Sequence, residues 1–115
     1  MQAKVRCLLK SQAISAQKVR PLLKTIRNSN VETALEQLEF LSMKTKAARL
    51  IFKALSSAVA NAENNANLDI YSLTVSKAVA DESFTLKRMR ARAKGRGARI
   101  FKRRCHILIE VTENN

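Results

Sequence analysis

The sequence has few of the residues that build catalytic or metal-binding sites. Its 115 residues include one histidine, two cysteines, no tryptophan and nine acidic residues. Zinc sites need three or four ligands, and Cys7, Cys105 and His106 lack the spacing of paired ligands. Cys105 and His106 are neighbours in a predicted strand, so their side chains point to opposite faces, which disfavours a nucleophilic pair. We therefore expect no enzyme, no metal and no cofactor.

The acidic residues also argue against a nuclease. Asp81 and Glu82 form the only acidic pair beside the basic segment described below, and a two-metal site would need more carboxylates. We interpret this pair as a turn at the base of a hairpin or as a local charge partner. The segment 94–97 (KGRG) lacks the spacing of a phosphate-binding P-loop.

Other absences bear on location. No apolar run approaches the ~18 to 20 residues that span a bilayer, and no apolar signal-peptide core follows Met1. The basic segment lacks the bulky apolar face of a membrane-surface helix. We expect a cytoplasmic protein without a membrane span. Two free cysteines fit this location better than a disulfide, although the sequence alone leaves both open.

What the sequence does contain is basic charge. The 22 Lys and Arg residues outnumber the acidic ones enough to give a net charge of +13. Ten of them lie within residues 84–109, a segment without any acid that also holds both glycines, Gly95 and Gly97. Such a charge density repels itself unless a polyanion neutralises it, and nucleic acid is the usual partner. The glycines would let the backbone turn or approach a sugar-phosphate chain closely.

Hydrophobic periodicity predicts three helices and three strands. Residues 4–10 alternate as a half-buried strand, and later strands place Leu73, Val75, Lys77 and Val79, and then Cys105, Ile107, Ile109 and Val111, on their inner faces. Helices are expected from Ser15 to about Arg27, after a Ser29–Glu32 capping box, and from about Met43 to Asn64. Pro21 conflicts with the first helix, which either starts later or is kinked. The expected fold is α+β, with three helices packed on a small three-stranded antiparallel sheet.

The basic segment is predicted to form a long hairpin arm, residues 82–104 of a single domain that spans residues 1–115. Its strands would turn near residues 91–97, because a structureless loop of this length is unusual in a compact domain. The alternative is a disordered basic loop. A two-stranded ribbon is only marginally stable alone, so the arm needs nucleic acid packed around it. Phosphate contacts would make its affinity steeply dependent on salt, while recognition would come from the shape of a folded RNA.

Several segments together resemble one known family. They are residues 15–20 (SAQKVR), 57–65 (SAVANAENN), 81–82 (DE), 86–88 (LKR), 92–96 (RAKGR), 99–100 (RI) and 102–107 (KRRCHI). In this order and spacing they resemble the bacterial large-subunit ribosomal protein L22 (uL22) family over nearly the whole chain. Departures are Asn28 where glycine is frequent, Arg90 where an apolar residue is frequent, Ala91 at a common proline position and Ala98 where an acid is frequent.

The resemblance implies a structural protein seated on 23S rRNA, which supports subunit assembly and is not a homo-oligomer. It implies that the arm lines the nascent-peptide exit tunnel, with its tip near the constriction shared with ribosomal protein L4. In the family, changes around the segment that matches residues 86–88 alter the response to macrolides. The candidate rRNA-binding residues are Lys18, Arg20, Lys87, Arg88, Arg90, Arg92, Lys94, Gly95, Arg96, Arg99, Lys102, Arg103 and Arg104. The candidate tunnel-lining residues are Leu86, Lys87, Arg88, Met89, Arg90 and Ala91.

Two other functional classes compete with this interpretation. A free-standing nucleic-acid module, such as an RNA chaperone or an architectural DNA-binding protein, would need an arm that is stable by itself. A small RNA-processing enzyme is disfavoured by the shortage of histidine and of clustered carboxylates.

Overall fold

The structure, a computed structural model, describes residues 4–91 and 97–113, with side chains described for residues 4–83 and 103–113. The elements follow one another as β1 (Lys4–Gln12), α1 (Ala16–Ile26), α2 (Val31–Ser42), α3 (Lys46–Ala66), a 3-10 turn η1 (Ile70–Ser72), β2 (Leu73–Ala91) and β3 (Gly97–Glu113). Three helices and a three-stranded sheet confirm the predicted α+β fold.

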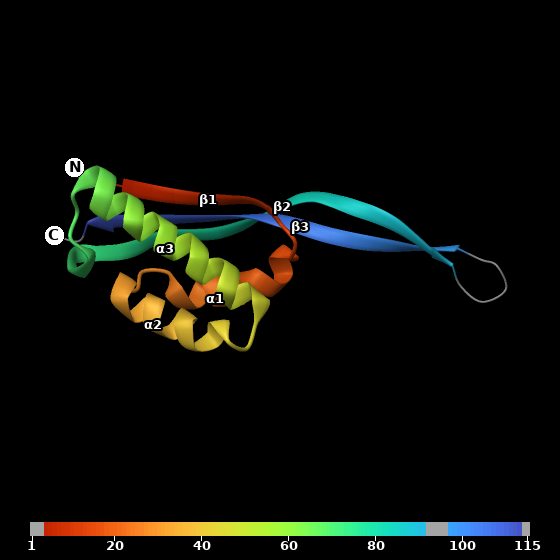
Figure 1. The fold of residues 1–115 in the computed structure, drawn as a ribbon, viewed down its shortest axis with the longest axis horizontal. Coiled ribbons are helices and arrows are strands. Elements are labelled where there is room, and N and C mark those ends of the chain that lie inside the picture. The colour runs from red at the N-terminus through yellow and green to blue at the C-terminus, as the bar shows by residue number, and fades with distance from the viewer. Residues whose placement is uncertain (1–3, 92–96, 114–115) are drawn as a thin grey trace.

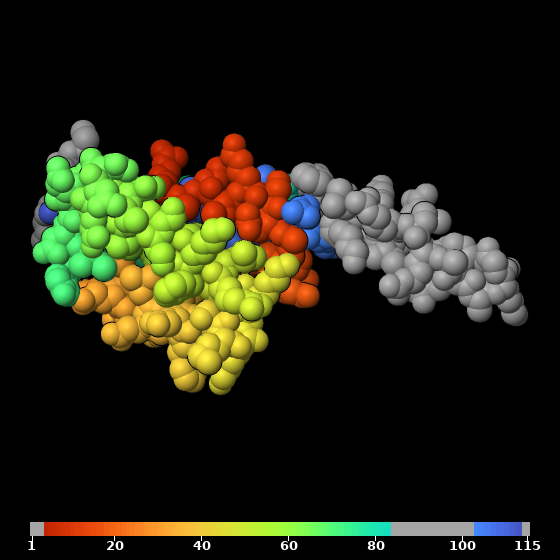
Figure 2. All heavy atoms as spheres, in the orientation of Figure 1, coloured from red at the N-terminus to blue at the C-terminus, as the bar shows by residue number. Residues whose placement is uncertain are grey.

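The sheet has the strand order β1-β3-β2, with both pairings antiparallel. Helices α1 and α3 pack on one face of the sheet, and α2 packs mainly against α3 (Figure 1). Figure 2 shows this covered side, where residues of α2 and α3 form much of the visible surface of the body. β2 and β3 continue together away from this body as a projecting hairpin, as predicted (Figure 1).

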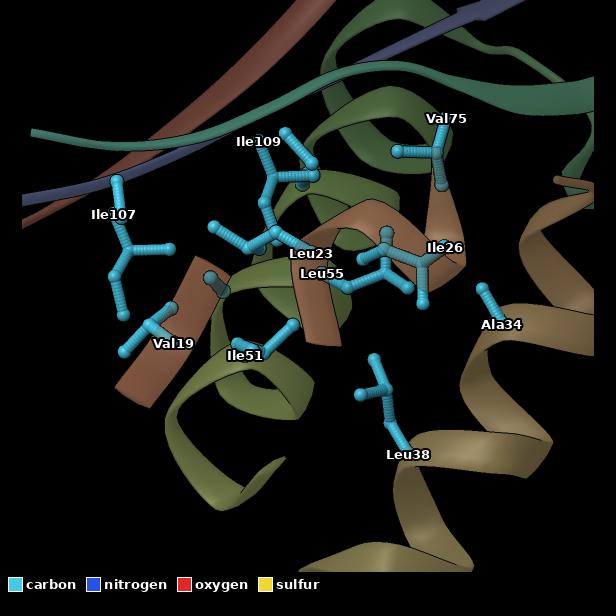
Figure 3. Close-up of a cluster of buried hydrophobic side chains, with 14 of the residues drawn as sticks. Val19, Leu23, Ile26, Ala34, Leu38, Ile51, Leu55, Val75, Ile107 and Ile109 are labelled. Carbon is cyan, nitrogen blue, oxygen red and sulfur yellow. The ribbon is translucent and has the colours of Figure 1, made fainter. Parts of the chain in front are cut away.

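The hydrophobic core lies between the sheet and the helices. Figure 3 shows Val19 and Leu23 of α1 beside Ile51 and Leu55 of α3, beneath Ile109 of the sheet. Burial of a large aliphatic side chain contributes about 1.5 to 3 kcal/mol relative to leaving it exposed. The side chains of the predicted β3 inner face are fully buried: Cys105, Ile107, Ile109 and Val111.

The inner face of β2 was predicted only in part. Leu73 and Val75 are buried as expected, but Lys77 is exposed, Val79 is only partly buried, and Ala78 and Ala80 are buried instead. The cause is a β-bulge, because Val75 pairs with Val111 and Lys77 pairs with Glu110, which leaves Ser76 as an extra residue. One extra residue in a strand moves every later side chain to the opposite face.

The predicted capping box at Ser29 and Glu32 is wrong. Asn30 is the N-cap of α2, and its side-chain oxygen accepts a hydrogen bond of 3.0 Å from the amide of Glu32. Ser29 is instead bound to β2, because its carbonyl oxygen accepts a bond of 3.0 Å from the amide of Val75. This backbone contact places the start of α2 one residue later than the pattern suggests.

The starts of α1 and α3 differ less from the sequence prediction. α1 begins at Ala16, so a later start is ruled out, and Pro21 lies inside the helix. Ser15 is the N-cap residue but its side chain makes no capping hydrogen bond. α3 begins at Lys46 rather than near Met43, because the Thr45 hydroxyl accepts a capping bond of 3.2 Å from the amide of Ala48.

Candidate nucleic-acid interface

The basic segment is built on the outer part of the β2–β3 pairing. β1 pairs with β3 only as far as Gln12 opposite Cys105, so the sheet has three strands up to that point. Beyond it, β2 and β3 alone continue through seven pairs, from Thr85 opposite Arg103 to Ala91 opposite Gly97. We call these paired residues, 85–91 and 97–103, the ribbon. Because of the ribbon, the molecule measures 64 × 26 × 20 Å, much longer than it is wide (Figure 1).

A second irregularity marks the root of the ribbon. Glu82 pairs with Cys105 and Thr85 with Arg103, so β2 has one residue more than β3 between these pairs. Ser83 lies at this point, with its Oγ 3.5 Å from the Oγ of Ser11 at the end of β1. Irregularities of this kind bend a strand and increase its twist. They commonly occur where a strand leaves the sheet, as it does here.

Most of the predicted contact residues lie on the ribbon or, in sequence, between its two strands. Arg92, Lys94, Gly95 and Arg96 lie outside the described residues. Backbone pairing is described for further candidates, whose side chains lie outside the described ones: Leu86, Lys87, Arg88, Met89, Arg90, Ala91, Arg99 and Lys102. Arg103 is exposed at the root of the ribbon. The structure therefore gives these residues a common scaffold, and their contacts stay a prediction.

Arg104 is partly engaged within the protein. Its side chain is half-buried, and its Nε donates a hydrogen bond of 3.0 Å to the carbonyl oxygen of Ser11. The amide of Ser11 in turn donates a bond of 2.9 Å to Nδ1 of His106. Arg104 and His106 thus hold the end of β1 against the root of the ribbon. The sequence patterns did not indicate a role for Ser11 or His106 here.

The two candidates on α1 lie on different sides of the helix. Lys18 lines a groove with Leu22 and with the start of α3 at Thr45, Lys46 and Ala47. Arg20 lies against β2, where its Nε and Nη2 donate bonds of 3.3 and 3.1 Å to the carbonyl oxygen of Ala80. Both side chains are exposed.

Arg27 makes the same kind of contact as Arg20. Its Nε donates a hydrogen bond of 2.8 Å to the carbonyl oxygen of Ala78. β2 is an edge strand, and the outward carbonyls of an edge strand are open to unwanted pairing with other chains. The two arginines therefore cover part of this edge. The helical spacing of residues 20, 24 and 27 is the sequence signal that relates them.

The described part of the chain offers little for catalysis. Cys7 and Cys105 are free thiols, and no group of three or more His, Cys, Asp or Glu side chains in residues 4–91 and 97–113 could hold a metal ion. Cys105 is buried on the core face whereas His106 lies on the other face, as the alternation predicted. Burial raises the pKa of the Cys105 thiol, and the nearby charge of Arg20 opposes this shift only partly. Among the described helices, none is long and apolar enough to cross a membrane.

Comparison with known proteins agrees with this architecture. The family model described as ribosomal protein L22p/L17e matches residues 7–112, which include the helices, most of the sheet and the whole basic segment. Proteins of this family are components of the large ribosomal subunit, which agrees with the cytoplasmic location expected from the sequence. The chain therefore belongs to the ribosomal protein L22p/L17e family, whose members are structural, rRNA-binding proteins of the large ribosomal subunit.

Proposed function

We propose that the arm, residues 82–104, lines the nascent-peptide exit tunnel of a bacterial-type large subunit, with its tip near the constriction formed with ribosomal protein L4. The observation that carries this proposal is the ribbon, which extends as seven backbone pairs beyond the last contact with β1. A two-stranded ribbon is marginally stable in water, so its partner must surround it. Folded RNA supplies both the enclosing walls and the negative charge.

In this proposal the basic side chains of the arm bind the phosphates of 23S rRNA. The contacts are assigned to the ten basic residues of the arm, to Gly95, and to Lys18 and Arg20 on the body. Residues 86–91 face the tunnel, where they meet the nascent peptide and influence the response to macrolides. The body anchors the arm during assembly, because the three-stranded sheet holds β2 and β3 in register up to Cys105.

Site-directed crosslinking tests the position of the arm. A thiol-reactive crosslinker is placed at residue 91 of an Ala91→Cys variant in which Cys7 and Cys105 are replaced by alanine, and subunits carrying this variant translate truncated messages of increasing length. We expect crosslinks to nascent chains only when the chain is long enough to reach the constriction. A matched Lys53→Cys variant, at an exposed position on α3, should give none. Equal crosslinking from both positions, or none from residue 91, would contradict the proposal.

Deletion of residues 86–88 tests whether the arm has a role beyond anchoring. Sucrose-gradient analysis should show the deletion variant in large subunits in nearly normal amount, because the body and the remaining cations are kept. The response to macrolides and the progress of nascent chains should change instead. A variant that fails to enter subunits would show that residues 86–88 serve assembly. Wild-type protein found mainly as a free pool would remove the basis of the whole proposal.

A further inference from the structure

The end of α2 presents apolar side chains to solvent. Phe40 and Met43 are 66% and 90% exposed, and because they are three residues apart they are neighbours on one side of the helix end. Glu36 and Glu39 precede them by about one turn and are exposed as well. We call these four residues the α2 patch. Figure 2 shows this end of α2, in yellow, at the lower edge of the body.

The α2 patch is not needed to hold α2 in place. Val31, Ala34 and Leu38 form the buried side of the helix, and α2 packs mainly against α3. Phe40 and Met43 are not part of the hydrophobic core. Single exposed apolar side chains are common on proteins, but large ones that lie together mark a surface for a partner.

The charge of the patch indicates what kind of partner fits. α2 contains Glu32, Glu36 and Glu39, which are three of the nine acidic residues of the chain, and it contains no Lys or Arg. At spacings of four and three residues these carboxylates repel one another along the helix. Glu39 lies in the last turn, where the negative end of the helix dipole also disfavours an acid.

The rest of the described protein does not neutralise these acids. Among the described side chains, the ion pair found joins Arg6 to Glu110 in the sheet, so the carboxylates of α2 have no such partner there. The acidic helix belongs to a chain with a net charge of +13. RNA phosphates would be repelled by this surface, whereas a cationic segment would relieve the repulsion within α2.

We propose that the α2 patch binds a basic segment of a neighbouring protein, in which an apolar side chain is flanked by lysine or arginine. The apolar side chain packs on Phe40 and Met43, and the flanking cations pair with Glu36 and Glu39. This surface is separate from the arm, so the inference does not depend on where the arm lies.

The residue types of the patch suit such a segment. The methionine side chain is unbranched and polarizable, so it adapts to apolar side chains of different shape. The ring of Phe40 already has the Nζ of Lys44 at 4.8 Å from its centre. An arginine of the partner can take the place of Lys44, because a guanidinium stacks well on an aromatic face.

Binding of a defined peptide tests the patch in purified full-length protein. The probe is a fluorescent peptide of alternating arginine and leucine, and fluorescence anisotropy measures its affinity. Because the protein as a whole is strongly basic, long-range repulsion works against non-specific binding of this peptide. We expect Phe40→Ala/Met43→Ala to weaken binding about 10-fold, and Glu36→Gln/Glu39→Gln to weaken it about 3- to 10-fold.

Two matched controls change the same residue types elsewhere. Tyr71→Ala removes another exposed aromatic side chain, and Glu63→Gln removes an exposed acid on α3. Both should bind the peptide as the wild type does. If the wild type does not bind the peptide, or if either double variant of the patch binds it as tightly as the wild type, the proposal fails.

Urea denaturation separates binding from folding. Glu36→Gln/Glu39→Gln removes like-charge repulsion from α2, so it should raise the midpoint slightly while it weakens binding. Phe40→Ala/Met43→Ala changes exposed side chains and should leave the midpoint nearly unchanged. A purely structural role for these residues would instead lower stability and binding together.

A photoreactive phenylalanine analogue at position 40 identifies the occupant in assembled large subunits. Mass spectrometry of the crosslinked peptide should find a segment of a neighbouring protein with an apolar residue flanked by lysine or arginine. Crosslinks to rRNA or to a second copy of this chain, or no crosslinks, would overturn the proposal. The proposed position of the arm would be unaffected, because crosslinking from residue 91 tests it independently.

Discussion

The backbone amide of Ser11 donates a hydrogen bond of 2.9 Å to Nδ1 of His106, which joins β1 to β3 where the ribbon leaves the body. Ser11 has a φ of 51°, in the left-handed region that costs a non-glycine residue about 1 to 2 kcal/mol. Arg104 donates a hydrogen bond of 3.0 Å to the carbonyl oxygen of Ser11, and this bond helps to offset the cost of the left-handed conformation. Nδ1 is the acceptor of this bond from the Ser11 amide, so the bond requires an Nδ1 that carries no hydrogen.

Replacing His106 by phenylalanine should destabilise the protein. The substitution keeps a ring but removes the acceptor, and a part-buried amide left without a partner costs about 1 to 3 kcal/mol. Urea denaturation at neutral pH measures the change in the free energy of unfolding. Ser11→Gly is the matched control: it keeps the amide and the carbonyl and tolerates a positive φ, so it should be nearly neutral. Equal midpoints for His106→Phe and the wild type would show that this bond adds no stability.

Asn28 provides a second test of backbone conformation. Its φ is 60°, and its amide donates a bond of 2.7 Å to the carbonyl oxygen of Val75. Asparagine adopts this left-handed conformation more readily than most other residues with a side chain. Asn28→Gly should keep or slightly raise the melting temperature, whereas Asn28→Ala should lower the free energy of unfolding by about 1 kcal/mol. Calorimetry of the two variants would contradict this account if alanine proved as stable as glycine.

Periodicity predicted the elements of this fold well because the core is a single layer between the sheet and the helices. Val19 and Leu23 on α1 and Ile107 and Ile109 on β3 follow the 3.6 and 2.0 periods without interruption, and all four are buried. The burial of such residues can be predicted from the sequence, because helix and strand geometry decide which face each side chain occupies.

Two features that the sequence did not indicate share one cause, which is contact between segments far apart in the sequence. Ser29 carries the spacing of a capping residue, yet its carbonyl is bound to Val75, more than 40 residues away. Arg20 matches a family segment as a phosphate-binding residue, but its hydrogen bonds to Ala80 appear only in three dimensions. Local pattern contains no information on such pairs.

The bulge at Ser76 makes an unusual deletion tolerable. Without Ser76, Val75 and Lys77 would become consecutive, and Ala78 and Ala80 would keep their present partners and their buried faces. We expect loss of Ser76, whose hydroxyl bonds to Glu110, to cost about 1 kcal/mol or less. Deleting Val79 should be far more damaging, because it moves Ala80 and all later residues of β2 to the wrong face.

Urea denaturation of the two deletion variants measures this difference, and circular dichroism shows whether each retains the fold. A Ser76 deletion as damaging as the Val79 deletion would mean that the bulge is needed for the twist of the sheet and not merely accommodated by it.

Cys105 gives a prediction for alkaline pH. Burial raises the pKa of its thiol, with the charge of Arg20 opposing the shift. The unfolded chain therefore releases this proton at lower pH than the folded protein does, so the unfolded state binds fewer protons in the window between the two pKa values. Stability from this group is complete below the pKa of the unfolded thiol and is lost as the pH rises through the folded pKa.

We expect the difference in unfolding free energy between the wild type and Cys105→Ala to narrow as the pH rises from neutral into the alkaline range. The contributions of the other titrating groups to the unfolding free energy are the same in both proteins, so they cancel in this difference. The buried thiol should also resist modification by a thiol reagent until the protein unfolds, whereas the half-buried Cys7 should react earlier. A Cys7→Ala variant isolates the signal of Cys105. Rapid labelling of this variant in its native state would show that the core opens beside Arg20. The hydrogen bonds from Arg20 to Ala80 would then not be enough to keep Cys105 covered.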